Sequence, residues 1–162
     1  QTERAIMEVD YFSQVFFTKT VLPTLLKQKS GRVVFVSSVA GLLGTQYRAS
    51  YSAAKAAIHM WANSLRAEVA KEGVEVSVVF PGFVKTNVSF NALNGEGKPQ
   101  GHQDEAIENG LEPDLFAQTT VSALLAGEEY IVVGGAREKL GVWVSRLSPS
   151  TLYKMIRKMK VK

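Results

Sequence analysis

Three residues in the first third of this 162-residue chain have the types and spacing that proton-transfer chemistry requires. Tyr51 and Lys55 stand four positions apart in "YSAAK", and side chains at positions i and i+4 of a helix share one face. A tyrosine hydroxyl ionises too weakly to be a good acid or base at neutral pH, but a neighbouring ammonium group stabilises the phenolate. Ser38, thirteen residues upstream of Tyr51, can hold a substrate oxygen while the tyrosine moves the proton. The set therefore predicts acid–base chemistry at an oxygen atom.

A tyrosine and a lysine at this spacing also occur by chance on helices that have no catalytic role. The elements around them must therefore decide between a catalytic pair and an ordinary helix. β-branched runs at 32–38 and 74–80, each entered from a glycine, predict two strands buried on both faces. Between them, apolar residues recur every three or four positions over 50–70, which is typical of an amphipathic helix. Strand, helix and strand predict a right-handed βαβ unit, and ligands bind at the carboxyl ends of such strands. Because Ser38 ends the first strand, it is expected at that ligand-binding edge.

The rest of the sequence predicts further elements of one α/β layer structure. Helical spacing over 3–29, interrupted at Pro23, predicts a long helix with a bend. Residues 113–126 predict another helix, and 130–133 predict a last strand. The segment 81–104 holds four glycines and two prolines, which indicates a mobile loop that could act as a lid over a binding face.

The basic charge of the chain is concentrated at its end. The formal net charge is +4, whereas residues 146–162 contain six lysines and arginines and no acidic residue. We therefore expect one partial α/β domain over 1–145, followed by a basic amphipathic helix at 146–162. The apolar residues that share one face of this helix are Leu152, Met155, Ile156 and Met159. We favour packing of this face on the domain, with peripheral contact to a membrane as the alternative. No recognition motif accompanies the charge, so no nucleic-acid partner is expected.

Several classes of protein are excluded by what the sequence lacks. The chain has no cysteine, which excludes disulfides, thiolate zinc sites and a cysteine nucleophile. His59 and His102 lack the spacing of metal ligands, so no metal is expected. The longest uncharged stretch, between Arg32 and Arg48, is shorter than a membrane span. The opening residues lack a signal peptide and a methionine, so we expect a true start upstream of Gln1 and an intracellular location, cytoplasmic or membrane-associated.

Three segments, taken in their order and spacing, resemble the carboxyl-terminal half of a short-chain dehydrogenase/reductase: "GRVVFVSSVAG", "YSAAK" and "VVFPGFVKTN". The resemblance covers residues 7–133 and implies the second half of a Rossmann-like, doubly wound parallel sheet. It implies that Ser38 polarises the substrate oxygen, Tyr51 transfers the proton, and Lys55 supports the phenolate while holding the nicotinamide ribose close to Tyr51. It also implies that four residues after the second strand approach the nicotinamide, namely Pro81, Gly82, Val84 and Thr86.

Two features of the sequence depart from the family pattern. Where the family usually has an asparagine, "VDYFS" has Asp10, and an ionised carboxylate near Tyr51 would oppose phenolate formation unless it is neutral or hydrogen-bonded elsewhere. A solvated helix carboxylate is the ordinary alternative. The chain also lacks a glycine-rich pyrophosphate-binding turn, and "VVGGAREKLG" at 132–141 is better interpreted as an ordinary turn. The amino-terminal strands, and the residue that selects NAD or NADP, are therefore expected outside this chain, with NADP favoured.

The resemblance implies an NAD(P)-dependent oxidoreductase of carbonyl or hydroxyl compounds, with Asp10 joining the catalytic set. Apolar residues of the 81–104 loop suggest a hydrophobic substrate such as a lipid, steroid or retinoid, namely Phe83, Val88, Phe90 and Leu93. The alternative is a non-catalytic assembly module, because in relatives the helices that match 5–28 and 50–70 pack against a second subunit. A serine–lysine hydrolase using Ser38 and Lys55 is a third possibility, although no nucleophile elbow is present.

Overall fold

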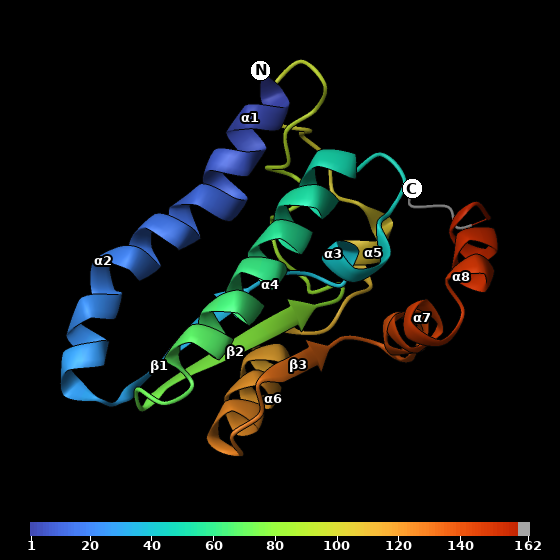
Figure 1. The fold of residues 1–162 in the computed structure, drawn as a ribbon. Coiled ribbons are helices and arrows are strands. Elements are labelled where there is room, and N and C mark those ends of the chain that lie inside the picture. Colours follow the sequence, from blue (N-terminus) through green and yellow to red (C-terminus); the bar gives the residue numbers. More distant parts are fainter. Residues whose placement is uncertain (159–162) are drawn as a thin grey trace.

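The computed structural model describes residues 1–158 and contains a three-stranded parallel sheet (Figure 1). The strands are β1 (Gly31–Val36), β2 (Val74–Pro81) and β3 (Tyr130–Val133), and β2 lies in the centre. All three strands run in the same direction. Their carboxyl ends therefore gather at one edge of the sheet, as the βαβ pattern predicts.

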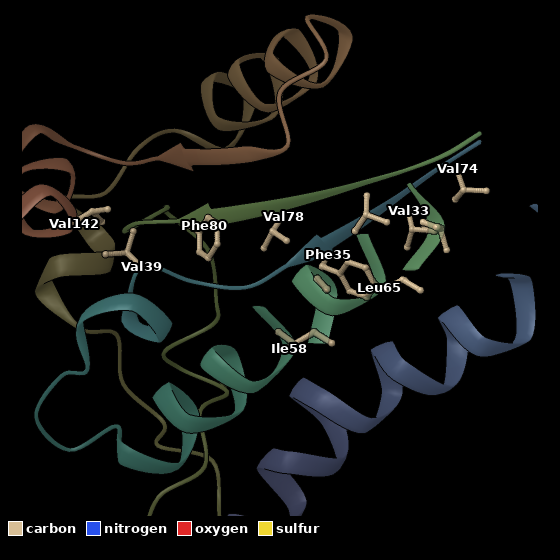
Figure 2. Close-up of a cluster of buried hydrophobic side chains, with 12 residues drawn as sticks. Val33, Phe35, Val39, Ile58, Leu65, Val74, Val78, Phe80 and Val142 are labelled. Atoms are coloured by element: carbon tan, nitrogen blue, oxygen red, sulfur yellow. The ribbon is translucent and has the colours of Figure 1, made fainter. Parts of the chain in front are cut away.

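The helix α4 (Ala49–Val69) covers one face of the sheet and confirms the predicted amphipathic helix. Its buried residues include Ile58 and Leu65, which pack against Phe35, Val78 and Phe80 of the strands (Figure 2). Burial of each such side chain contributes about 1.5–3 kcal/mol, so this layer fixes the position of α4 on the sheet. The other face of β2 and β3 is covered by α6 (Pro113–Leu125), which confirms the predicted second helix.

Burial of the first strand differs from the prediction. β2 is buried on both faces, but Val34 and Val36 of β1 are 38% and 50% exposed. The reason is position, because β1 lies at an edge of the sheet and the apolar side chains of α6 pack on β2 and β3. The strand also ends earlier than expected, at Val36, so that Ser38 lies two residues beyond it.

The long amino-terminal helix contains one irregular turn. It consists of α1 (Thr2–Met7), the π-helical turn η1 (Glu8–Phe12) and α2 (Ser13–Gln28), and α2 continues through Pro23 without ending there. The Ser13 hydroxyl, just after η1, donates to the carbonyl of Val9 within it. The interruption therefore lies at η1 and not at Pro23. Single π-turns of this kind occur frequently at functional sites.

The carboxyl-terminal part differs most from its prediction. Residues predicted as a turn after β3 form α7 (Ala136–Leu147). The predicted basic helix is α8 (Pro149–Ile156), with Ser148 at its N-cap and Pro149 in its first turn, as the sequence predicts, while residues 146–147 belong to α7. The end of that predicted helix, with Met159, Lys160 and Lys162, lies outside the described residues. Short helices α3 (Ala40–Leu43) and α5 (Glu105–Glu108) complete the fold. Across residues 1–158, every helix is too short or too polar to cross a bilayer.

Candidate active site

The residues that follow β1 and β2 lie side by side at the carboxyl edge of the sheet. The ladder continues past both strands, since the Ser37 amide donates to the Val79 carbonyl at 2.9 Å and the Val39 amide to the Pro81 carbonyl at 3.0 Å. Ser38 between them is 8% exposed. Its hydroxyl lies 3.5 Å from the Pro81 carbonyl oxygen and accepts a hydrogen bond from the Ala40 amide at 3.1 Å. The structure thus places Ser38 at the predicted edge.

The segment that carries Ser38 is fastened directly to α4. The Ser37 hydroxyl donates to the Lys55 carbonyl at 2.7 Å. Gly41 packs so closely that a Cβ there would lie 2.8 Å from the Lys55 carbonyl carbon. Only glycine permits this approach, because backbone atoms of a helix cannot move aside for a methyl group. The serine segment and the helix that carries Tyr51 are therefore held together.

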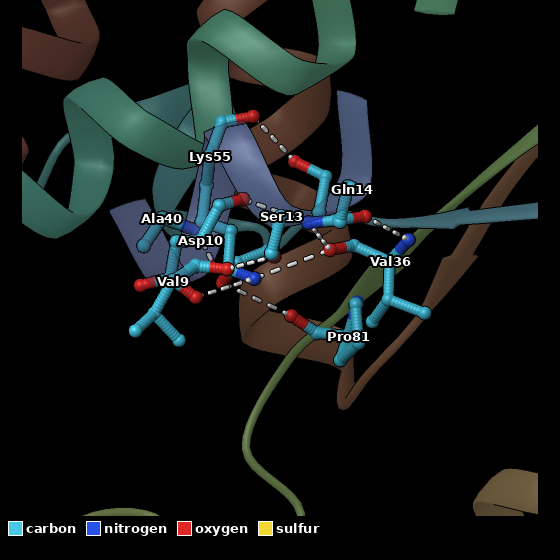
Figure 3. A network of polar contacts seen from close by, with 10 residues as sticks. Val9, Asp10, Ser13, Gln14, Val36, Ala40, Lys55 and Pro81 are labelled. Carbon is cyan, nitrogen blue, oxygen red and sulfur yellow. Dashed lines mark hydrogen bonds and ion pairs between the residues drawn. The ribbon is translucent and has the colours of Figure 1, made fainter. Parts of the chain in front are cut away.

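Tyr51 and Lys55 meet on one face of α4, as their spacing predicts. The Lys55 ammonium nitrogen lies 5.7 Å from the centre of the Tyr51 ring. Lys55 is 8% exposed and has two polar partners, the Asp10 carboxylate at 3.0 Å and the Val36 carbonyl at 3.2 Å (Figure 3). Within residues 1–158, the half-buried Tyr51 hydroxyl makes no hydrogen bond. An ammonium group with three protons retains one donor for a further partner.

Asp10 joins this pair from the π-turn. Its side chain is 23% exposed and its carboxylate faces the Lys55 ammonium, so it is not simply a solvated helix carboxylate. The backbone carbonyl of Asp10 is bonded separately, by the Gln14 side-chain amide at 2.7 Å. A carboxylate at this distance cancels part of the field of the ammonium group. The ion pair therefore offsets part of the positive charge that Lys55 presents to the ring of Tyr51.

Gln14 is a member of the site that the sequence analysis missed. The Val36 amide donates to its side-chain oxygen at 3.3 Å, and its amide nitrogen donates to the Val36 carbonyl at 3.5 Å. These contacts serve backbone groups at the open edge of β1, where no strand supplies partners. A signal was present, because Gln14 stands four residues after Asp10 and so lies on the same helix face.

The four residues expected to approach a nicotinamide lie at the end of β2 and in the loop after it, and their contacts differ. Pro81 ends β2, and the next amide, of Gly82, donates to the Val133 carbonyl at 2.8 Å. A Cβ on Gly82 would lie 3.0 Å from the Cα atom of Gly134, so the two glycines permit close packing of the strand ends. Val84 pairs with Leu111 in an isolated bridge, and the exposed hydroxyl of Thr86 turns back to the Val84 carbonyl at 3.4 Å. Pro81 and Gly82 are thus nearest to Ser38 along the sheet edge.

The loop over residues 82–104 is folded on itself and tied to α4. Ser89, 1% exposed, accepts a hydrogen bond from the Asp104 amide at 3.1 Å. Asp104 forms an ion pair with Arg48, three residues before Tyr51, and accepts from the Gln100 side chain at 2.8 Å. The side chains of this pair are 27% and 12% exposed. We infer that the pair fixes the loop relative to the helix that carries Tyr51.

Replacement of Asp104 with asparagine is expected to loosen this loop. Loss of a charged, part-buried hydrogen bond raises local opening about tenfold, which hydrogen exchange of the amides at 86–104 will report. The matched control is Glu96→Gln, because the Glu96–Lys98 pair of the same loop is 74% exposed on both sides and is expected to contribute nothing measurable. Equal exchange in the two variants would contradict a fastening role for Asp104.

Two surface hollows lie outside the group formed by Tyr51, Lys55 and Pro81. One is lined by α6 and the turn after it, and the other lies between α3, α4 and α8. Neither is lined by Tyr51, Lys55 or Pro81.

His59 belongs to an aromatic cluster under α4. Its ring lies edge-on to Phe80 and Tyr130, with centroids 4.9 Å and 6.0 Å away. Burial lowers the pKa of His59 from its ordinary value of 6.5, and the positive charges of Arg66 and Arg146 lower it further. Among the described residues, no three histidine, cysteine, aspartate or glutamate side chains gather as a metal site would require.

The lowered pKa of His59 predicts a loss of stability in mild acid. Below the ordinary histidine pKa of about 6.5, the unfolded chain binds a proton on this imidazole, whereas the folded chain binds it only at lower pH. The free energy of unfolding therefore decreases as the pH is lowered through this range. His59→Gln is expected to reduce the difference in unfolding free energy between about pH 7.5 and about pH 5.5, measured by urea denaturation. The exposed His102 offers the control variant, His102→Gln. A difference unchanged by His59→Gln would refute this role.

Comparisons with known proteins identify the family to which this chain belongs. A family model described as short chain dehydrogenase matches residues 1–96. This chain belongs to the short-chain dehydrogenase family. It is 40% identical over 157 residues to a dehydrogenase/reductase SDR family protein 7-like of Drosophila melanogaster, covering 97% of this chain and 48% of that protein. It is 35% identical over 154 residues to dehydrogenase/reductase SDR family member 7B of Xenopus laevis, covering 95% and 48%. The chain spans about half the length of the curated relatives it matches.

Solved structures share the fold. A short chain dehydrogenase from Burkholderia cenocepacia, solved in complex with NADP, superposes with a TM-score of 0.77 at 24% identity, over 95% of this chain and 58% of that one. A short-chain dehydrogenase from Streptomyces avermitilis gives 0.72 at 26% identity, over 96% and 62%. The three-stranded parallel sheet with its helices is thus part of a Rossmann-like fold.

Proposed function

We propose that this chain carries the proton-transfer half of an NAD(P)-dependent oxidoreductase site. The observation that carries the proposal is the buried Lys55 ammonium beside the ring of Tyr51, whose hydroxyl is unbonded, at the carboxyl edge of a parallel sheet. A buried cation next to a free phenol on a ligand-binding edge is an arrangement for acid–base chemistry. Membership of the dehydrogenase family supports the same conclusion.

In this proposal each polar residue has one task. Ser38 donates a hydrogen bond to the substrate oxygen, and Tyr51 gives that oxygen a proton when a carbonyl is reduced. Lys55 stabilises the phenolate that remains, and Asp10 holds the ammonium in place while weakening its field. In the oxidative direction Tyr51 removes the proton from the alcohol. The tasks of Ser38 and Tyr51 are separate, because one orients the oxygen and the other changes its protonation.

The residues present fit the nicotinamide end of the cofactor. Lys55 keeps a donor for a ribose hydroxyl, and Tyr51 lies beside it. The turn of Pro81 and Gly82 offers backbone without bulky side chains, followed by Val84 and Thr86. When bound, the nicotinamide supplies or accepts the hydride that accompanies the proton. We favour NADP over NAD, and expect the pyrophosphate-binding turn on a segment outside this chain.

A hydrophobic substrate is supported by the loop after β2. Val88 and Phe90 are 54% and 47% exposed, and Leu93 is 39% exposed. The ion pair of Asp104 with Arg48 joins the loop to the start of the helix that carries Tyr51. The loop with these apolar side chains is therefore held at the Tyr51 end of that helix. We propose a lipid-like, steroid-like or retinoid-like carbonyl or alcohol as the substrate class.

A second candidate function is assembly with another copy of the protein. The amino-terminal helix exposes a large apolar surface made of Val9, Phe12, Phe16 and Phe17, which are 49–76% exposed. Exposed apolar surfaces of this size are typical of protein contacts. Homo-oligomer formation through 5–28 and 50–70 is compatible with the oxidoreductase proposal and needs no cofactor. The serine–lysine hydrolase has less support, because the Lys55 ammonium bonds Asp10 and Val36 and makes no contact with Ser38.

Nucleotide titration tests the proposed function. NADPH and NADH fluorescence is followed during titration into this chain and into a longer version that carries the sequence encoded upstream. We expect binding by the longer version only, with NADPH bound more tightly than NADH. Absence of binding by the longer version would refute the oxidoreductase proposal. Sedimentation of the same samples reports the oligomeric state independently.

A further inference from the structure

The outer face of α7 carries an apolar stripe that the proposed site does not use. Leu140, Trp143 and Leu147 are 58%, 62% and 79% exposed, at positions i, i+3 and i+7. Residues at this spacing form one continuous stripe on a helix. Exposing a tryptophan and two leucines to water in one stripe is unfavourable in free energy, and such patches mark contact sites for a protein or a membrane.

The stripe points away from the body of the protein. The opposite side of α7 is the packed side, where Val142 is 6% exposed and a Cβ on Gly141 would lie 3.0 Å from Leu43. β3 leads into α7 beyond the carboxyl edge of the sheet, and α8 follows next to it (Figure 1). The stripe thus faces outward from one end of the molecule.

Two cations flank the stripe on α7, Arg137 and Lys139. Residues 136–158 contain six lysines and arginines and a single acidic residue, Glu138. Arg137 and Lys139 are exposed and, at 100° per residue, fall on opposite sides of the stripe. Glu138 is turned inward, because its carboxylate accepts the Phe83 amide at 3.4 Å. The charges that flank the stripe on α7, Arg137 and Lys139, are therefore both positive, whereas Arg146 lies over the ring of Tyr130.

We propose that α7 lies on an anionic lipid membrane, with Leu140, Trp143 and Leu147 in the headgroup boundary and the flanking cations on anionic headgroups. An amphipathic helix with tryptophan and leucine on one face and cations beside them has the composition of an interfacial helix. A second copy would fit poorly, because a symmetric contact through the stripe would set the flanking cations against one another. The inference does not depend on the proposed oxidoreductase activity.

Another exposed apolar face of the same chain provides a matched control. On α6, Leu125 is 84% exposed and Leu115 is 52% exposed, but Glu112, Asp114 and Glu128 near them in the sequence are acidic. The cation that reaches the end of α6, Arg32, bonds the Leu124 carbonyl and is paired with Glu75. If apolar exposure alone caused lipid binding, α6 would bind as well as α7. If the cationic surroundings are required, only α7 binds.

Vesicle flotation of this chain tests the proposal. Vesicles of phosphatidylcholine with about 30% phosphatidylserine are compared with pure phosphatidylcholine, at low and high salt. We expect binding to the anionic vesicles at low salt and weak binding to the neutral ones. Arg137→Gln with Lys139→Gln is expected to weaken binding about 25-fold, about fivefold for each charge. Trp143→Ser is expected to weaken it about tenfold or more, and Leu125→Ser to leave it unchanged.

A fluorescence measurement locates the contact independently. In a Trp61→Phe background Trp143 is the remaining tryptophan, and its emission is expected to shift to the blue with anionic vesicles. The substitutions on α6 and α7 replace exposed side chains, whereas Trp61 packs against Phe35, so circular dichroism checks that the Trp61→Phe background keeps its fold. The proposal is overturned by absence of binding, by equal binding to neutral vesicles, or by equal losses in Leu125→Ser and Trp143→Ser. Lipid-free self-association lost in Trp143→Ser, without vesicle binding, would assign the stripe to a second copy instead.

Discussion

Replacing Tyr51 with phenylalanine is expected to lower turnover of the complete protein by about 10²–10⁴-fold. The change removes only the hydroxyl that transfers the proton. The ring remains, so the Lys55 ammonium that lies 5.7 Å from the ring centre keeps its place. Nucleotide affinity is therefore expected to change little. The measurement is the steady-state rate of nicotinamide oxidation with a carbonyl compound that the complete protein reduces.

Tyr47 provides the control for this experiment. It lies four residues upstream of Tyr51 and is 88% exposed. Tyr47→Phe removes the same hydroxyl from a solvated position and is expected to leave the rate unaltered. A Tyr51→Phe protein that kept half of the normal turnover would show that the proton comes from another group.

Replacing Lys55 with methionine is expected to lower both activity and stability. Turnover is expected to fall about 10²–10³-fold, because the phenolate loses its cation. The free energy of unfolding is expected to fall by about 1–3 kcal/mol, because the part-buried Asp10 carboxylate loses its partner at 3.0 Å. The first effect is measured by turnover of the complete protein and the second by urea denaturation.

The double variant Asp10→Asn with Lys55→Met separates these two effects. It removes the orphaned charge, so stability is expected to recover most of what Lys55→Met loses. Turnover is expected to stay low, because the cation beside Tyr51 is still missing. If turnover recovered together with stability, Lys55 would be a structural residue and not a participant in proton transfer.

Elements whose apolar spacing matches their burial could be predicted from the sequence. The strand at 130–133 and the helix α4 are confirmed, because the residues that repeat along them are the ones that enter the core. α7 could not be predicted this way. Its stripe of Leu140 and Trp143 faces outward, and the two glycines before it favour a turn. The π-turn at 8–12 could not be predicted either, because the apolar spacing of the sequence over 3–29 is that of an ordinary helix.

Some contacts of the candidate site could be predicted from local sequence patterns, and others could not. The meeting of Tyr51 and Lys55 follows from helix geometry, and the place of Ser38 follows from the end of a strand. The Asp10–Lys55 and Arg48–Asp104 pairs join residues far apart in the sequence. No local pattern specifies such contacts, because they depend on how the amino-terminal helix and the loop pack on α4. The roles assigned to the site residues remain predictions.

Transfer of deuterium from C4-labelled NADPH tests the account most directly. The complete protein is incubated with a panel of hydrophobic aldehydes and ketones, and the alcohol products are analysed by mass spectrometry. A phenol beside a buried ammonium predicts deuterium on the new carbinol carbon with the unaltered protein, and almost none with Tyr51→Phe in the same time. Equal labelling by the two proteins, or nucleotide binding without label in any product, would contradict it.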